Sequence, residues 1–228
     1  MTPGELLALF RTESRDLQSP YLWEDPEVYG YMNAAQEMFC RFTDGINDSS
    51  SSVTQLVVTA NSPTVDLDPS LRRIRQARLL STNQFLTILN PEDVELGNFV
   101  YDDYGIQRSS GLDLTATGTP RYLITGMDDT AARLSPIPVA DDTIALVVQR
   151  LPITAIEDDA DDLEVAERHH RYLLWWMQHL AHLKQDAEAY DRGRSQMFRD
   201  MFQAYCSQVY GEQLRMQHKY RAMSYGGI

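Results

Sequence analysis

Apolar residues recur at helical spacing through the first 46 residues of the chain. Thr2-Pro3-Gly4-Glu5 has the form of a capping box, in which the Thr and Glu side chains bind backbone amides at a helix start. Asp25-Pro26 also has the form of a helix start, with an acceptor side chain before a proline. We therefore predict two amphipathic helices, whose apolar stripes are Leu6, Leu7 and Phe10, and then Val28, Tyr31, Met32, Ala35, Phe39 and Phe42.

Residues 52–153 show a different pattern, with short β-rich segments in place of helical stripes. A serine-rich break at residues 47–52 precedes them and could act as a hinge. Clusters of Pro, Asn, Gly and Asp separate the segments, as turns separate strands. Short strands at this spacing predict a small antiparallel sandwich or barrel. The candidate strands are residues 53–59, 85–89, 121–124 and 144–148.

Helical spacing returns at residue 161. Asp161 or Asp162 is expected to cap a helix that continues to Leu183, and Asp186 is expected to cap a second helix. Two long helices joined by a few polar residues form an antiparallel hairpin. The second stripe ends near Val209, and the helix could continue for some residues beyond it. The two stripes are Val165, Ala166, His169, Leu173, Trp176, Met177 and Leu180, and then Phe198, Met201, Phe202, Tyr205 and Val209.

The expected fold class is α+β. Neither helical segment is expected to bury its apolar face alone, so the simplest arrangement packs both into one helical bundle and leaves the β-rich block as an insertion. The expected parts are N-terminal bundle helices at residues 1–46, an inserted antiparallel β domain at 52–153, a C-terminal helical hairpin at 161–211 and a docking tail at 212–228. The residues expected to share one core are Tyr31, Phe39, Leu173, Trp176, Phe198 and Phe202.

Composition and charge exclude several classes of protein. Of the 228 residues, 43% are hydrophobic and 23% are charged, as in a folded globular protein rather than a disordered one. The formal net charge of −13 argues against a general nucleic-acid binder and against binding to an anionic membrane surface. Cys40 and Cys206 lie in apolar helical patterns, which indicates small core residues in a reducing compartment. The first residues lack a signal-peptide pattern, so the chain is expected to be cytosolic when made.

Neither a metal or cofactor site nor a catalytic centre is expected. His179, His182 and Asp186 have ligand-like spacing, but no second helix supplies the matching carboxylates. The acidic run at residues 157–162 lacks the central glycine of a calcium loop, and acidic residues before a helix already favour its dipole. The sequence contains no phosphate-binding loop and no nucleophile motif, so it predicts a protein that is not an enzyme.

Two local charge patterns stand out against the acidic total. The basic run contains Arg72, Arg73, Arg75 and Arg78, which could contact DNA phosphates or an acidic partner, or could be the solvated edge of a strand or turn. Residues 192–228 carry six Lys or Arg against two acidic residues, whereas residues 128–167 are strongly acidic. Head-to-tail self-assembly or docking on a charged partner would use such polarity, and helix-dipole complementarity and solubility would also account for it.

The order of several short motifs resembles one known family. Gly118-Thr119-Pro120-Arg121-Tyr122 is followed by Leu134-Ser135-Pro136-Ile137-Pro138 and later by Arg150-Leu151-Pro152. His169-His170-Arg171-Tyr172 opens an apolar helix, Lys184-Gln185-Asp186 follows it, and Asn33-Ala34-Ala35-Gln36 lies in the early helix. In this order the motifs resemble the head-to-tail adaptor proteins of short-tailed phages, which are also called tail tubular protein A or head-completion proteins.

The resemblance implies a structural virion protein without catalysis or cofactor. Members form a ring, usually of twelve copies, that sits beneath the portal, extends the DNA channel and receives the next tail component. The expected partners are therefore further copies of the chain, the portal protein and a tail nozzle or tail tube protein. DNA would pass through the channel without sequence-specific binding, and the acidic composition fits this, because negative charge repels phosphate.

The family also suggests where the chain acts and which residues dock. Its members lie at the head–tail junction of the virion, and their C-terminal tails commonly dock on the portal. The candidate portal-docking residues are therefore Leu214, Arg215, Met216, Lys219, Tyr220, Arg221, Met223 and Tyr225. The alternatives are a small cytosolic enzyme and a carbohydrate-binding virion module, for which Tyr101, Tyr104 and Tyr122 would be the loop aromatics.

Overall fold

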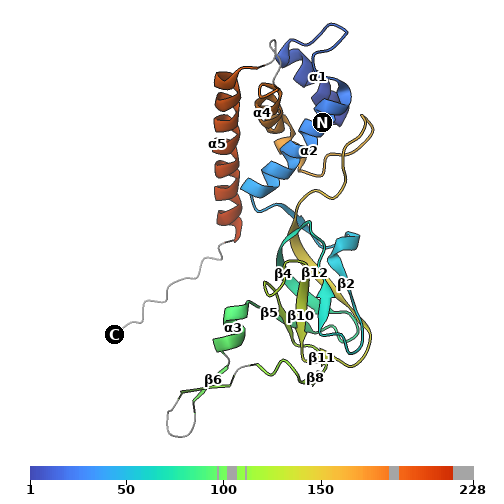
Figure 1. The fold of residues 1–228 in the computed structure, drawn as a ribbon, viewed down its shortest axis with the longest axis vertical. Helices are drawn as coiled ribbons and strands as arrows, with labels where there is room; N and C mark the ends of the chain where they lie inside the picture. Colours follow the sequence, from blue (N-terminus) through green and yellow to red (C-terminus); the bar gives the residue numbers. More distant parts are fainter. Residues whose placement is uncertain (97, 102–106, 111, 185–189, 218–228) are drawn as a thin grey trace, which may run out of the picture. The chain divides into compact units, whose positions relative to one another are not determined.

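The computed structural model describes residues 1–96, 98–101, 107–110, 112–184 and 190–217 (Figure 1). Within these, the chain forms two compact units. The first, here called the helical unit, combines Met1–Ile46 with the described residues from Leu151 onward. The second, here called the β unit, contains the described residues of Asn47–Arg150. Each unit is described by itself below.

The helical unit contains four α-helices and one 3-10 turn within its described residues. The capping box at the N-terminus is confirmed, because Thr2 Oγ1 accepts from the Glu5 amide at 3.2 Å and Glu5 Oε2 accepts from the Thr2 amide at 3.0 Å. A basic residue lies in the last turn of the first two helices, where it complements the helix dipole. The elements are α1 (Pro3–Ser14), α2 (Asp25–Phe42), the turn η2 (Glu167–His169), α4 (His170–Ala181) and α5 (Arg192–Gln217).

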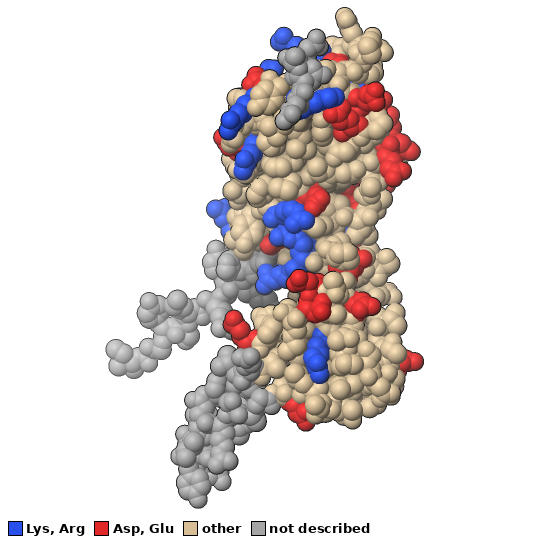
Figure 2. Space-filling model, viewed as in Figure 1, with Lys and Arg blue, Asp and Glu red and all other residues tan. Residues whose placement is uncertain are grey.

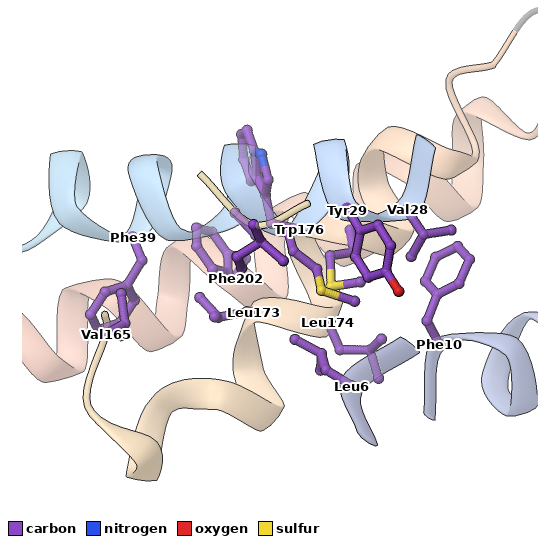
Figure 3. Packing of buried hydrophobic residues seen from close by; sticks show 14 of the residues in the cluster. Leu6, Phe10, Val28, Tyr29, Phe39, Val165, Leu173, Leu174, Trp176 and Phe202 are labelled. Atoms are coloured by element: carbon purple, nitrogen blue, oxygen red, sulfur yellow. The ribbon is translucent and has the colours of Figure 1, made fainter. Parts of the chain in front are cut away.

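One hydrophobic cluster joins all four helices (Figure 3). Of the six residues expected in a shared core, four are buried in this cluster and Tyr31 packs against it half-buried. Phe198 is the exception, because its ring stacks on His182 at 5.9 Å at the margin of the cluster. Trp176 lies near the centre, with its ring 5.2 Å from that of Phe202. The four buried residues are Phe39, Leu173, Trp176 and Phe202.

The expected helix start at Asp161 or Asp162 is wrong, because the helix begins at His170. The preceding residues form an irregular loop whose backbone amides bind carboxylates. Asp161 Oδ2 accepts from the amides of Glu157 and Asp158, at 2.7 and 3.0 Å, so this side chain caps a turn instead of a helix. The expected cap Asp186 lies outside the described residues. Asp191 performs this role before α5, where its Oδ1 accepts from the Arg194 amide at 3.0 Å.

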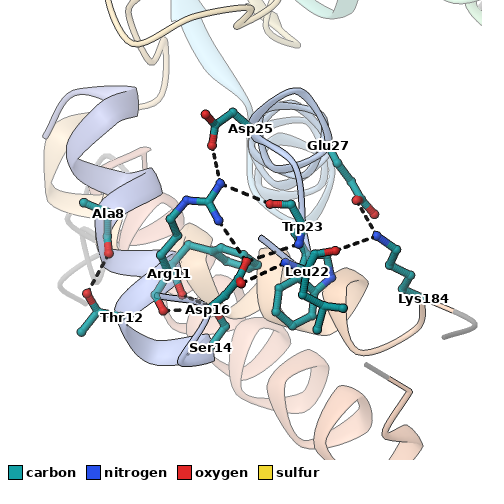
Figure 4. Close-up of polar contacts among 11 residues, drawn as sticks. Ala8, Arg11, Thr12, Ser14, Asp16, Leu22, Trp23, Asp25, Glu27 and Lys184 are labelled. Atoms are coloured by element: carbon teal, nitrogen blue, oxygen red, sulfur yellow. Dashed lines mark hydrogen bonds and ion pairs between the residues drawn. The ribbon is translucent and has the colours of Figure 1, made fainter. Parts of the chain in front are cut away.

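A buried ionic network closes the connection between α1 and α2 (Figure 4). Arg11 donates from Nη1 to Asp16 at 2.9 Å and from Nη2 to Asp25 and to the Trp23 carbonyl. Asp16 also accepts from the backbone amides of Leu22 and Trp23, at 2.9 and 3.3 Å. The charges are therefore paired and the connecting backbone is hydrogen-bonded, which a buried polar segment requires.

The β unit is built on a curled sheet of eight strands. The order in the sheet is β1-β12-β4-β5-β9-β10-β3, and β2 pairs with β12 beside this path. Two smaller pairs, β11 with β8 and β6 with β7, complete the described strands.

The elements of the β unit, in chain order, are β1 (Ile46–Asp48), the 3-10 turn η1 (Ser52–Thr54), β2 (Gln55–Val58), β3 (Thr64–Asp66), β4 (Leu71–Leu79), β5 (Phe85–Leu89), α3 (Pro91–Leu96), β6 (Asn98–Tyr101), β7 (Gln107–Ser110), β8 (Thr117–Gly118), β9 (Tyr122–Ile124), β10 (Ala131–Ser135), β11 (Ile137–Pro138) and β12 (Asp142–Arg150).

The expected fold class, a helical bundle with an inserted antiparallel β domain, is wrong. The structure is a mixed α/β fold with a large curled sheet of eight strands, which has a hydrophobic core of its own beside the cluster of the helical unit. The described helices therefore do not form a bundle that serves as the single core. The sheet is not purely antiparallel either, because β5 pairs in parallel with β9. A crossover connection that contains α3 makes this pairing possible. The segregation of helical and strand segments along the chain follows the expectation, but their architecture does not.

The β unit begins and ends at a buried ion pair. Asp48 Oδ2 accepts from Arg150 Nε at 2.5 Å, and the two side chains are only 7% and 9% exposed. Asp48 Oδ1 accepts from the amides of Ser50 and Ser51, at 2.9 and 3.2 Å. Burial alone would raise the pKa of Asp48, but the Ser50 and Ser51 hydrogen bonds and the Arg150 guanidinium outweigh it and hold the pKa well below its usual range.

We expect Trp176→Ala to lower the free energy of unfolding of the helical unit by about 3–5 kcal/mol, because it removes a buried aromatic ring from the cluster. Urea unfolding followed by the helical circular-dichroism signal measures the change. Met216→Ala is the matched control, because Met216 is 80% exposed and its loss should change the free energy by less than about 0.5 kcal/mol. A loss below about 1 kcal/mol in Trp176→Ala would show that the ring contributes little to this core.

We expect Asp48→Asn to cost about 3 kcal/mol of unfolding free energy at pH 7, because it removes the carboxylate that neutralises the buried Arg150. The pKa of Asp48 is lowered by folding, so its contribution is present above the unfolded pKa of about 4 and is lost as the pH falls through the folded value. Urea unfolding of both proteins from pH 7 to pH 3 should therefore show a difference that shrinks below about pH 4. Asp129→Asn, at an exposed position, is the control. A difference that is independent of pH would contradict this role.

Candidate interaction surfaces

The basic run of the sequence forms strand β4. Arg72, Arg73 and Arg75 are exposed, so the structure brings three of the four candidate arginines together on one surface. The fourth, Arg78, is half-buried further along the strand, and its Nη1 donates to Asn83 Oδ1 at 2.9 Å. Strand β4 lies between β12 and β5 in the sheet, but β5 pairs only with Ala77 and Arg78, so among the described residues the arginine-bearing part of β4 has no strand partner on that side. The alternative of a solvated strand edge therefore stays open beside that of a partner contact.

Two β-bulges shape this part of β4. Val147 and Val148 are neighbours on β12, but their partners on β4 are Gln76 and Ile74, so Arg75 is an extra residue between them. The same shift recurs between Gln149 and Arg150, whose partners are Arg73 and Leu71, and it makes Arg72 the extra residue. Both extra residues are therefore arginines.

The bulges determine which way the arginines face. In a regular strand alternate residues share a face, so Arg73 and Arg75 would share the face of Ala77, which is fully buried in the sheet core. The observed exposure instead repeats every three residues, and Leu71 and Ile74 pack against the core while the residues between them are exposed. The bulges thus keep the guanidinium groups out of the apolar interior, where unpaired charge would be costly.

A cavity of about 640 Å³ opens beside the arginines. Strands β4 and β5 pair only at Ala77 with Leu86 and Arg78 with Phe85, and β5 then turns to pair with β9. The cavity lies where the two strands separate, so apolar side chains line it together with the guanidinium groups. Its lining residues are Leu67, Leu71, Arg72, Arg73, Ile74, Arg75, Ile88, Asn90 and Thr125.

The acidic run at residues 157–162 is a second surface, here called the acidic loop. Its start is anchored by Ile156, which is 2% exposed and exchanges two hydrogen bonds with the Asn33 side chain, at 2.8 and 3.0 Å. Tyr29 Oη donates to Asp159 at 2.6 Å, and burial together with this hydrogen bond raises the pKa of Tyr29. The pKa of Asp161 is lowered by the Glu157 and Asp158 amides that it accepts from. The loop is therefore held in one conformation.

The side chains considered as metal ligands have other roles. His179 Nδ1 lies 2.8 Å from Ser195 Oγ, and burial lowers the pKa of His179. The ring of His182 stacks on that of Phe198, with their centroids 5.9 Å apart. A further histidine, His169, has its Nδ1 2.8 Å from Tyr205 Oη, and burial lowers the pKa of His169 to about 4, which favours the neutral ring. Within the described ranges, no three His, Cys, Asp or Glu side chains converge as metal ligands do. The Asp186 position lies outside those ranges.

The candidate portal-docking residues begin on the last turns of α5. This helix continues through Gly211 to Gln217, so Leu214, Arg215 and Met216 are helical. Arg215 and Met216 are exposed, Met216 by 80%, while Leu214 is half-buried. The remaining candidates lie outside the described residues, and they are Lys219, Tyr220, Arg221, Met223 and Tyr225.

Acidic and basic side chains both occur on the face drawn in Figure 2, where several of them lie next to one another among uncharged residues. None of the helices that the structure describes has both the length and the apolar character needed to cross a bilayer.

Of the aromatics considered for carbohydrate binding, Tyr122 is half-buried on β9, and the side chains of Tyr101 and Tyr104 lie outside the described part.

Sequence reasoning found the arginines but missed the bulges, the cavity and the ion pair of Asp48. A signal for the bulges was present in Leu71-Arg72-Arg73-Ile74-Arg75-Gln76-Ala77, where apolar residues recur every third position instead of every second. No local signal identifies the Asp48 pair, because its members are 102 residues apart in the sequence.

Comparison with known proteins assigns the chain to a family. No curated protein matches it. The family model of the SU10 adaptor protein matches residues 1–225, which is nearly the whole chain. The resemblance to phage head-to-tail adaptors is thereby confirmed, and membership in a structural family favours an adaptor over an enzyme. The chain belongs to the SU10 adaptor protein family, a family of phage head–tail adaptors.

Proposed function

We propose that the chain assembles into a ring of about twelve copies at the head–tail junction of a virion, between the portal protein and a tail nozzle or tail tube protein. The observation that carries this proposal is the family match over residues 1–225. An adaptor between two ring-shaped partners must present one surface to its neighbours in the ring and others to the components above and below. Repeated heterologous contacts close into a ring when the rotation between copies allows it.

The distribution of charge supports a channel through which DNA passes without being held. The net charge of −13 is spread over 228 residues, and a wall of this sign repels phosphate. Strand β4 carries four of the eight arginines of residues 47–150, and three exposed arginines are fewer than the broad basic face that duplex binding needs.

The end of α5 supports the proposal that the C-terminal segment docks on the portal. Arg215 and Met216 are exposed on the last turns of α5. Arginine and methionine are enriched in the cores of protein interfaces, so their exposure here suits a docking surface. The candidates that follow add Lys219, Tyr220 and Arg221 to the same segment. A segment of aromatic, Met and Arg residues is suited to bind a partner surface.

Native mass spectrometry of the purified chain, alone and mixed with the portal protein of the same phage, tests the proposed ring. We expect an assembly of about twelve copies, either with the chain alone or only when portal is present. A chain that remains monomeric in both samples and adds no mass to portal would contradict the proposal.

Deleting residues 218–228 tests the docking role, because the deletion keeps all of α5 as far as Gln217. We expect the truncated chain to keep its helical signal, because its core cluster ends at Val209, and to lose most of its binding to portal. Co-sedimentation with portal measures the binding. The control is Met197→Ala, an exposed site at the other end of α5. Undiminished binding of the truncated chain would place the docking contacts elsewhere.

A further inference from the structure

We propose that the acidic loop of one copy binds the arginine-lined cavity of the next copy in the ring. This inference rests on the proposed ring and specifies one of its contacts. The two surfaces differ, one on the helical unit and one on the β unit, and every copy carries both. Such a contact is heterologous, which is the kind that a ring requires.

The cavity of the β unit carries exposed arginines that suit an anionic ligand. The two bulges turn Arg73 and Arg75 outward beside the cavity, and neither side chain makes a hydrogen bond or ion pair within the described part of the chain. Guanidinium groups pair with carboxylates through two parallel hydrogen bonds, which fixes orientation as well as charge. Leu71, Ile74 and Ile88 line the same cavity, so it also offers contact to apolar atoms of the bound segment.

The loop side is rigid and presents carboxylates to solvent. Asn33, Tyr29 and the Asp161 carboxylate fix its backbone by the hydrogen bonds described above. Glu157 and Asp162 are exposed, and their side chains make no hydrogen bond or ion pair among the described residues. A loop that is already ordered loses little conformational entropy on binding. This part of the chain therefore has the charge and the ordered backbone that suit a ligand for the cavity.

Another copy fits the cavity better than DNA does. Three arginines that contact three phosphates would give only a weak, salt-sensitive attachment, and the net charge of the chain opposes it. A duplex is also convex and polar, whereas the cavity is concave and partly apolar. The acidic loop carries carboxylates next to Ile153 and Ala155, both exposed, so it matches the mixed character of the lining.

Charge reversal tests the contact directly. Arg73 and Arg75 beside the cavity are here called the arginine row. The row variant is Arg73→Glu with Arg75→Glu, and the loop variant is Glu157→Lys with Asp162→Lys. Each variant alone places like charges opposite each other at every contact, so we expect its assembled fraction to fall by about tenfold or more. In an equimolar mixture the two variants can alternate around the ring. The glutamates of the row variant then face the lysines of the loop variant, and the wild-type arginines of the loop variant face the wild-type acidic loop of the row variant. We therefore expect the mixture to recover rings that contain the two variants in equal numbers.

Native mass spectrometry with one variant isotopically labelled reads both the ring mass and its composition, under the portal conditions in which the wild-type chain assembles. Glu13→Lys with Asp129→Lys is the matched control for the loop variant, and Arg121→Glu is the control for the row variant, because all three positions are exposed. If wild type forms no ring, the proposed function fails. If wild type forms a ring and both variants assemble as it does, or if the mixture shows no rescue, the contact proposed here is overturned. Loss of DNA binding in the row variant with unchanged assembly would overturn it in favour of a phosphate contact.

Discussion

The pairing of β4 with β12 is the interaction on which the β unit depends. Strand β12 has β4 on one side and β1 and β2 on the other, so it links the two halves of the sheet. Its inward side chains Ile144, Leu146 and Val148 are at most 1% exposed and supply the centre of the core. The same ladder contains the two bulges that expose the arginines, and it ends at Arg150, whose guanidinium pairs with Asp48. The register between β4 and β12 thus determines the centre of the core, the exposure of the arginines and the position of the Asp48–Arg150 ion pair.

This dependence explains which parts of the fold could be predicted from the sequence. Caps and stripes are local, so the sequence predicts the starts of α1 and α2 within one residue, and the expected strand at residues 85–89 coincides with β5. Strand partners are not local, and no pattern within β5 indicates that it pairs in parallel with β9. The predicted helical bundle with an antiparallel insertion failed for this reason, because it was built from local patterns alone.

The candidate surfaces also combine features that the local sequence predicts with features that depend on contacts between residues far apart in the sequence. Arginines in a short run are visible in the sequence, but their exposure depends on bulges that arise only in the register with β12. Asp161 looked like a helix cap because an acidic residue before an apolar stripe has that role in most chains. Here the nearby amides of Glu157 and Asp158 compete for its carboxylate, and Gln36 of α2 accepts from the amides of Glu164 and Val165 at 2.8 and 3.2 Å. The loop therefore satisfies its backbone without becoming a helix, and an interaction with α2 that is remote in sequence decides the outcome.

The acidic total and the exposed arginines have opposite consequences for an adaptor, and the arginines are confined to one strand of the β unit. A net charge of −13 repels phosphate, which would suit the proposed passage of DNA. Self-assembly needs attraction between copies, and a uniformly acidic chain would oppose it by repulsion between like charges. In the proposed contact, a small basic surface on β4 and the acidic loop would provide that attraction without making the chain basic as a whole. Because exposed ion pairs are screened by salt, they would mainly select which surfaces meet, and apolar contact within the cavity would help to hold the surfaces together.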